Sequence, residues 1–79
     1  MTEVLTGQVA EIILHYILER FDNWEERHQT PRVCGYFKED AAFTCFDNTT
    51  HDCWVEQAKT EAMAIKWCLG KIEADELYF

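Results

Sequence analysis

Between residues 41 and 72, the apolar positions change from a spacing of two to spacings of three and four. Residues 41–46 (AAFTCF) and 53–56 (CWVE) are rich in the aromatic, β-branched and other apolar side chains that favour strands. Residues 47–52 (DNTTHD) lie between them, and Asn and Asp bond their own main chain in tight turns. The segment therefore predicts a β-hairpin.

A further strand is predicted just before the hairpin, over residues 32–38 (RVCGYFK). Alternate strand residues point to opposite faces, so Tyr36 and Phe37 place one aromatic ring on each face. The second strand has Phe43 and Phe46 on opposite faces, and the third strand has Trp54. We expect one face to form the core and the other, drawing on Tyr36, Phe46 and Trp54, to be partly exposed.

A helix is predicted to begin at Thr60, because apolar residues around it recur at spacings of three and four. The members of this stripe are Ala58, Ala62, Ile65, Leu69 and Ile72. We expect the stripe to lie on the sheet, so that Met63 and Trp67 face away from it. Either the first helix covers these two side chains or another molecule does, since Met and Trp are enriched in protein interfaces.

An earlier helix is predicted over residues 3–22, and its apolar surface exceeds twice the roughly 100° that a one-sided helix needs. One stripe comprises Leu5, Val9, Ile12 and Tyr16, and the far side carries Ala10, Leu14, Leu18 and Phe21. The helix must bury two faces, one on the sheet and the other on the second helix, on another copy of the chain or on a partner. Asp22 and Asn23 can cap a short helical continuation.

These elements predict one α+β domain over residues 1–79, in the order α-β-β-β-α, with both helices on one side of a three-stranded antiparallel meander. The order resembles that of double-stranded-RNA-binding domains, in which lysines at the start of the second helix grip phosphate. Here that start is residues 59–62 (KTEA), a single lysine beside an acid, and no basic loop precedes it. The resemblance covers the order of elements and not the RNA chemistry.

The charge balance narrows the choice of partner. Fifteen acidic and seven basic side chains give a formal net charge of −8. Such a surface repels nucleic-acid phosphates and attracts cationic partners, although an acid excess also simply improves solubility. We expect a protein partner with a basic surface, and no direct contact with nucleic acid or membrane. Because no apolar run is long enough to span a bilayer and no leader pattern occurs, we expect a cytoplasmic protein.

Candidate chemical groups are few. The cysteines are Cys34, Cys45, Cys53 and Cys68. No Cys-x-x-Cys pair occurs among them, so zinc binding has little support, and in a cytoplasmic protein we expect them to be reduced and structural. Residues 51–53 (HDC) bring together a base, an acid and a thiol, but neighbouring strand residues point to opposite faces. We therefore expect no enzymatic activity, no cofactor and no metal ion.

Small size, strong acidity, surplus apolar surface and the order of elements together resemble the small acidic inhibitors that bacteriophages encode, anti-CRISPR proteins among them. Some of those inhibitors use a helix and a three-stranded sheet to present carboxylates where DNA would bind. The resemblance implies an inhibitor that acts in the host-cell cytoplasm. The carboxylates it implicates lie in the two turns, the third strand and the C-terminal segment: Glu39, Asp40, Asp47, Asp52, Glu56, Glu73, Asp75 and Glu76.

A second hypothesis is a non-catalytic adaptor domain of a bacterial or mobile-element protein that forms a homodimer. A two-layer domain covers one side of each helix, so the remaining apolar side chains would meet across a two-fold axis. The side chains expected in that apolar interface are Leu14, Leu18, Phe21, Met63 and Trp67.

Overall fold

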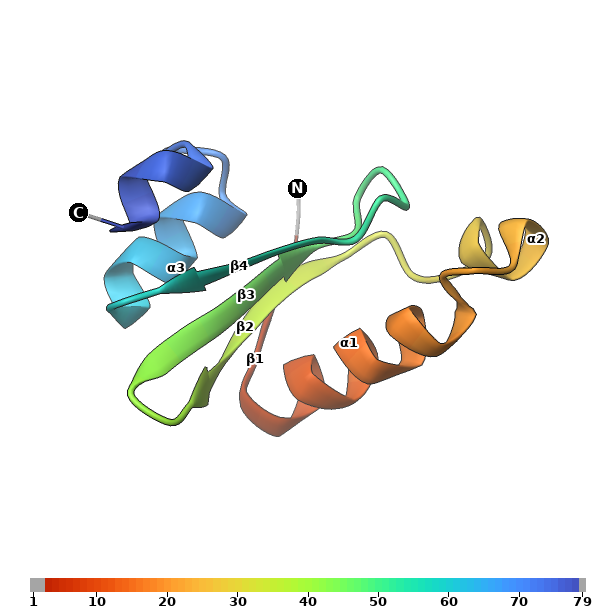
Figure 1. The fold of residues 1–79 in the computed structure, drawn as a ribbon, viewed down its shortest axis with the longest axis horizontal. Coiled ribbons are helices and arrows are strands. Elements are labelled where there is room, and N and C mark those ends of the chain that lie inside the picture. The colour runs from red at the N-terminus through yellow and green to blue at the C-terminus, as the bar shows by residue number, and fades with distance from the viewer. Residues whose placement is uncertain (1–2, 79) are drawn as a thin grey trace.

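A four-stranded sheet with helices on both faces is formed by residues 3–78, the part of the chain that the computed structural model describes (Figure 1). The strands lie in the order β1-β2-β3-β4 and comprise Val4–Thr6, Cys34–Glu39, Ala42–Asp47 and Trp54–Ala58, respectively. The helices are α1 (Gly7–Arg20), α2 (Trp24–Arg27), α3 (Glu61–Cys68) and a 3₁₀ helix, η1 (Ala74–Tyr78). The α+β class predicted from the sequence is confirmed.

The sheet contains one strand more than predicted, because residues 4–6 form β1 instead of the first turn of a helix. β1 pairs in parallel with β2, and Val4 lies opposite Cys34. Gly7, at φ +63°, adopts the left-handed conformation that turns the chain from β1 into α1. The remaining pairings are antiparallel, so β2, β3 and β4 form the predicted meander.

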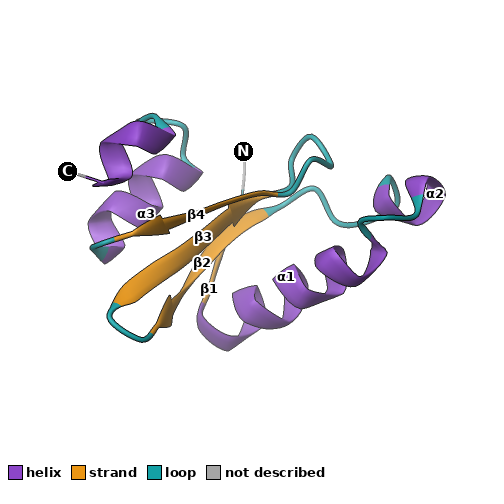
Figure 2. Cartoon of the chain, in the orientation of Figure 1, coloured by secondary structure: helices purple, strands orange, loops and turns teal. Residues whose placement is uncertain are grey.

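α1 and α3 lie on opposite faces of the sheet, whereas the sequence analysis placed both helices on one side (Figure 2). Two neighbouring residues of β2 show the reason. Tyr36 packs with α3 and η1, and Phe37 packs under α1. Because the central strands are apolar on both faces, each face needs its own cover, and a sheet with both helices on one side would leave the other face wet.

The core between the sheet and α3, here called the α3-side core, consists of Cys34, Tyr36, Cys45, Ala58, Ala64, Cys68 and Leu77. Met63 and Trp67 pack against this core, so the prediction that they face away from the sheet is wrong. The predicted stripe through Leu69 is also wrong, because α3 ends at Cys68 and Leu69 is exposed. That stripe extended an eight-residue helix into the strand before it and the loop after it.

The core between the sheet and α1, here called the α1-side core, consists of Ala10, Leu14, Ile17, Phe37, Phe46 and Cys53. Phe46 is therefore buried on this face, as Tyr36 is on the other. Three aromatic side chains were expected to be partly exposed, and the structure describes all three. Trp54 is exposed, whereas Tyr36 and Phe46 are buried. The expectation failed for Tyr36 and Phe46 because it left one face of the sheet without a helix.

Gly35 allows β1 and α1 to approach β2 closely. A Cβ atom at this position would lie 2.7 Å from the carbonyl oxygen of Leu5 and 3.2 Å from the Cβ of Ala10. The missing side chain therefore selects the face of α1 that contains Ala10 for burial. The opposite assignment, with the stripe through Ile12 on the sheet, would place larger side chains over Gly35.

Short polar contacts fix the connecting segments. The side chains of Asn23 and Thr60 accept backbone N–H bonds at the starts of α2 and α3, at 3.0 and 3.2 Å, so both predicted helix starts are capped. Asn48 is fully buried, and its amide donates to the Thr30 hydroxyl and the Pro31 carbonyl at 2.9 and 2.7 Å. These bonds hold the link between α2 and β2 against the β3–β4 loop.

We expect the substitution Gly35→Ala to lower the free energy of unfolding by about 1–3 kcal/mol, because the added methyl group must displace backbone at Leu5. Urea denaturation followed by tryptophan fluorescence measures the change. Ala41→Ser, at an exposed position in the β2–β3 turn, is the control and should stay within about 0.5 kcal/mol of the parent. A Gly35→Ala variant as stable as this control would contradict the close approach.

Candidate protein-binding surface

The side of α1 that points away from the sheet carries exposed apolar side chains. Val9 and Ile12 are each 58% exposed, and Tyr16 is 42% exposed. Their spacings of three and four residues place them along one stripe of the helix. Exposed apolar residues are ordinary when they are scattered singly, but a continuous stripe indicates a binding surface.

Acidic side chains border this stripe. A shallow depression along the helix is lined by Glu11, Ile12, His15, Tyr16, Glu19 and Arg20. Together with Val9, these residues define the outer α1 surface. The arrangement combines an apolar and aromatic centre with a charged edge, which is the usual anatomy of a protein interface.

Arg20 covers part of this surface. Its guanidinium carbon lies 3.7 Å from the centroid of the Tyr16 ring, and its Nη1 donates to the Tyr16 carbonyl oxygen at 3.1 Å. The same nitrogen lies 3.7 Å from Oε2 of Glu19. The ion pair is exposed and contributes little stability, so the stacking on Tyr16 is the better-defined contact.

The carboxylates predicted in the two turns lie at opposite ends of the sheet. Glu39 and Asp40 are at the β2–β3 turn, whereas Asp47 ends β3 and Asp52 follows it. Glu39 lies opposite Ala42, and Asp47 is five residues further along β3, which corresponds to roughly 17 Å at the usual rise of a strand. The carboxylate of Asp47 accepts bonds from the N–H and hydroxyl of Thr49, at 2.9 and 2.6 Å.

The other predicted carboxylates lie elsewhere again. Glu73, Asp75 and Glu76 are exposed in or next to η1, on the face of the sheet opposite α1. Glu56 is half-buried on β4. The eight candidates therefore do not form one patch. The acids of the outer α1 surface, Glu11 and Glu19, were not among the eight candidates.

The five side chains predicted for an apolar dimer interface are also dispersed. Leu14 is buried in the α1-side core, and Phe21 packs against the same core. Met63 and Trp67 pack on the other face of the sheet, against the α3-side core. Leu18 is 50% exposed and remains accessible to another molecule. The surplus apolar surface predicted for the first helix is present, but on the Val9 and Tyr16 side.

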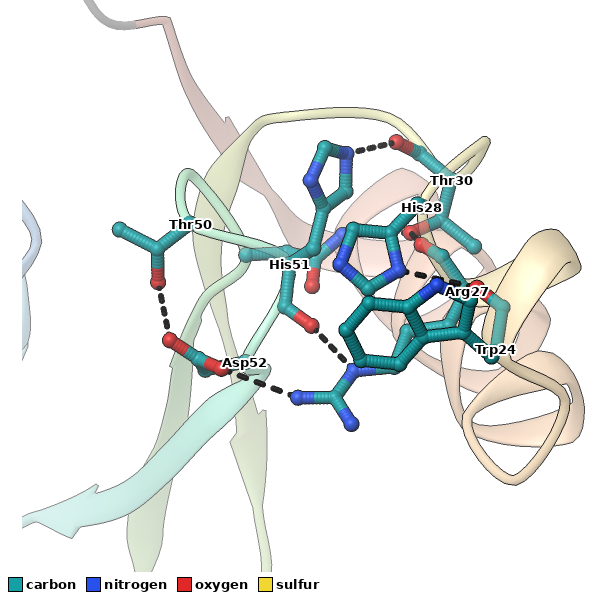
Figure 3. A network of polar contacts seen from close by, with 8 residues as sticks. Trp24, Arg27, His28, Thr30, Thr50, His51 and Asp52 are labelled. Atoms are coloured by element: carbon teal, nitrogen blue, oxygen red, sulfur yellow. Dashed lines mark hydrogen bonds and ion pairs between the residues drawn. The ribbon is translucent and has the colours of Figure 1, made fainter.

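A polar network joins α2 to the β3–β4 loop (Figure 3). Arg27 donates from Nε to the His51 carbonyl at 2.7 Å and from Nη2 to the Asp52 carboxylate at 2.9 Å. The ring centroids of His28 and His51 lie 5.3 Å apart, and those of Trp24 and His28 lie 4.0 Å apart with the two planes tilted by 44°. The network holds α2 against the β3–β4 loop, and Asp52 has a structural role in it as the ion-pair partner of Arg27.

The side chains of residues 51–53 do not converge. His51 lies with Nε2 3.2 Å from the Thr30 carbonyl oxygen, Asp52 faces Arg27, and Cys53 points into the α1-side core. No pairing of base and thiol suited to nucleophilic catalysis results. Among the described residues, no group of three His, Cys, Asp or Glu side chains is placed to hold a metal ion.

All four cysteines are free and buried. Burial raises the pKa of each thiol, that of Cys45 to about 12, and the nearby Glu56 carboxylate adds to that shift. The thiol of Cys34 donates to the Cys68 carbonyl at 3.5 Å, and that of Cys68 donates to the Gly35 carbonyl at 3.5 Å. The cysteines thus serve as small core side chains with neutral thiols.

No protein-family model, curated protein or solved structure matches the chain. Within residues 3–78, no helix is long and apolar enough to cross a bilayer.

We expect the folded protein to react slowly with a thiol reagent such as DTNB near pH 8, and all four thiols to react once the chain is unfolded. A pKa of about 12 leaves roughly one Cys45 side chain in ten thousand as the reactive thiolate near pH 8. The rate should rise as the pH approaches the raised pKa values. The number of free thiols is measured on protein that was expressed in the cytoplasm and unfolded without reductant. A count of two or none, instead of four, would show that disulfides form.

Proposed function

We propose that this chain is a non-catalytic protein-binding inhibitor that occupies a basic surface of another protein through the outer α1 surface. The observation that carries the proposal is the exposed stripe of Val9, Ile12 and Tyr16 beside Glu11 and Glu19. It supplies an apolar and aromatic centre of the kind that dominates binding energy, next to charges that orient a cationic partner.

The net charge supports the same class of partner. A formal charge of −8 on a chain of 79 residues accelerates encounter with a basic protein and opposes binding to nucleic-acid phosphates. A basic groove that normally holds nucleic acid is the complementary target, as in the phage-encoded inhibitors that the chain resembles. Such an inhibitor would act in the cytoplasm of the host cell.

The dispersion of the carboxylates shapes this proposal. An inhibitor that imitates a nucleic acid needs its charges on one side, and the predicted acids lie at both ends of the sheet and on the α3 face. The outer α1 surface therefore makes the primary contact in this proposal. The other acids contribute to the long-range field, which acts through net charge.

An adaptor that forms a homodimer is the second candidate function, and the same stripe favours it. A two-fold contact through the outer α1 surface would cover Val9, Ile12 and Tyr16 on both copies. It would also bring Glu11 and Glu19 of the two copies near one another. The two functions therefore have opposite dependence on salt.

We expect the immobilised protein to capture a basic protein from a bacterial lysate, and Ile12→Asp to reduce that capture by about tenfold or more because it removes a central apolar contact. Leu69→Asp is the matched control, since it adds the same charge at an exposed apolar position directly after α3. Capture should weaken as salt is raised.

Equal capture by the two variants would remove the outer α1 surface from the proposal. Tight, salt-sensitive binding of the purified protein to duplex DNA or RNA in a gel-shift assay would contradict the choice of a protein partner.

For the homodimer, we expect light scattering at micromolar concentration to give twice the 9.4 kDa mass of the chain, and Ile12→Asp to restore the single mass. Added salt should strengthen this self-association, because it screens the facing acids. A mass of 9.4 kDa at both low and high salt would exclude the homodimer. Binding to a different protein would then remain as the function of the outer α1 surface.

A further inference from the structure

We propose that the depression on the outer α1 surface is a site for an arginine side chain of the partner, and that Arg20 occupies this site in the free protein. This inference rests on the proposed function, because it names the group that the surface recognises. In this site the Tyr16 ring stacks against the guanidinium, and the Glu19 carboxylate pairs with its charge.

The chain's own arginine shows the chemistry of the site. The Arg20 guanidinium stacks 3.7 Å from the Tyr16 ring centroid and lies 3.7 Å from the Glu19 carboxylate. A flat cation on an aromatic face beside an acid is a favourable arrangement for guanidinium, which stacks better than the compact, strongly hydrated ammonium of lysine. The position is therefore suited to arginine in particular.

Arg20 can leave this position at small cost. Its ion pair with Glu19 joins neighbouring residues whose side chains are 33% and 74% exposed, and water can replace its exposed bond to the Tyr16 carbonyl. Exposed ion pairs contribute little, and a cation stacked on an exposed ring gains only a modest stabilisation. A partner's guanidinium, held also by contacts elsewhere in the interface, can therefore displace Arg20.

The surroundings favour a cation over an anion as the incoming group. Glu11 and Glu19 line the depression, and the whole chain has a formal charge of −8. A carboxylate from a partner could pair with Arg20, but it would approach these acids. Binding of an acidic ligand in this depression would therefore contradict the proposal.

The test uses hexaarginine as the probe and hexalysine as its charge-matched comparison. Titrations of the ¹⁵N-labelled full chain are followed by the backbone amide shifts of α1. We expect hexaarginine to shift α1 signals and to bind more tightly than hexalysine. Tyr16→Leu and Glu19→Gln should each weaken hexaarginine binding about two- to fivefold, because each removes one exposed contact.

The deciding variant is Arg20→Gln, which should tighten hexaarginine binding about two- to fivefold by removing the competing guanidinium. Lys71→Gln is its control, because it removes one positive charge at an exposed position after α3. Asp75→Asn is the matching control for Glu19→Gln. The dispersion of the amide signals shows whether each variant is folded.

Equal tightening by Arg20→Gln and Lys71→Gln would reduce the effect to net charge and overturn the site. Weaker binding by Arg20→Gln, or shifts confined to the turns at residues 40–41 and 48–52, would do the same. Loss of lysate capture by Ile12→Asp without any preference for hexaarginine would reject this site alone. A preference for hexaarginine with unchanged capture would instead reject the proposed function and retain the site.

Discussion

The approach of three backbone segments at Gly35 determines how the rest of the chain is arranged. The Leu5 carbonyl of β1 and the Cβ of Ala10 in α1 both lie where the side chain of any larger residue at position 35 would be. This contact places β1 beside β2 and sets the rotation of α1 about its axis. Once Ala10, Leu14 and Ile17 face the sheet, the stripe of Val9, Ile12 and Tyr16 must face the solvent. The candidate binding surface is thus a geometric consequence of a missing side chain.

Local sequence patterns predicted much of the fold. The three strands of the meander, the polar turn at residues 47–52, a cap at residues 22–23 and the helix start at Thr60 are all present. Each depends on contacts between residues that are close in sequence. The strand β1 was missed because Leu5 continues the apolar stripe of Val9, Ile12 and Tyr16. The available signal was Gly7 after three residues that favour extended backbone.

The faces of the helices were harder to predict than their existence. Both stripes of α1 are apolar, so periodicity alone could not choose between them, and the choice depended on small residues meeting across sequence at Ala10 and Gly35. For α3, a helix of eight residues has too few turns to define a stripe reliably. The site followed the same limit, since the sequence left open which stripe of the first helix lies on the sheet, and Glu19, Tyr16 and Arg20 meet on the side that proved to be exposed.

The parallel pairing of β1 with β2 also has a consequence for the order of folding. The turns that join β2, β3 and β4 are short, so these strands meet after little loss of chain entropy, whereas Val4 reaches Cys34 only by closing a loop that includes α1 and α2. We expect the meander to form first and α1 to dock late. Until it docks, Phe37 and Phe46 are open to other chains, and a chaperone would meet this face of the sheet before α1 covers it.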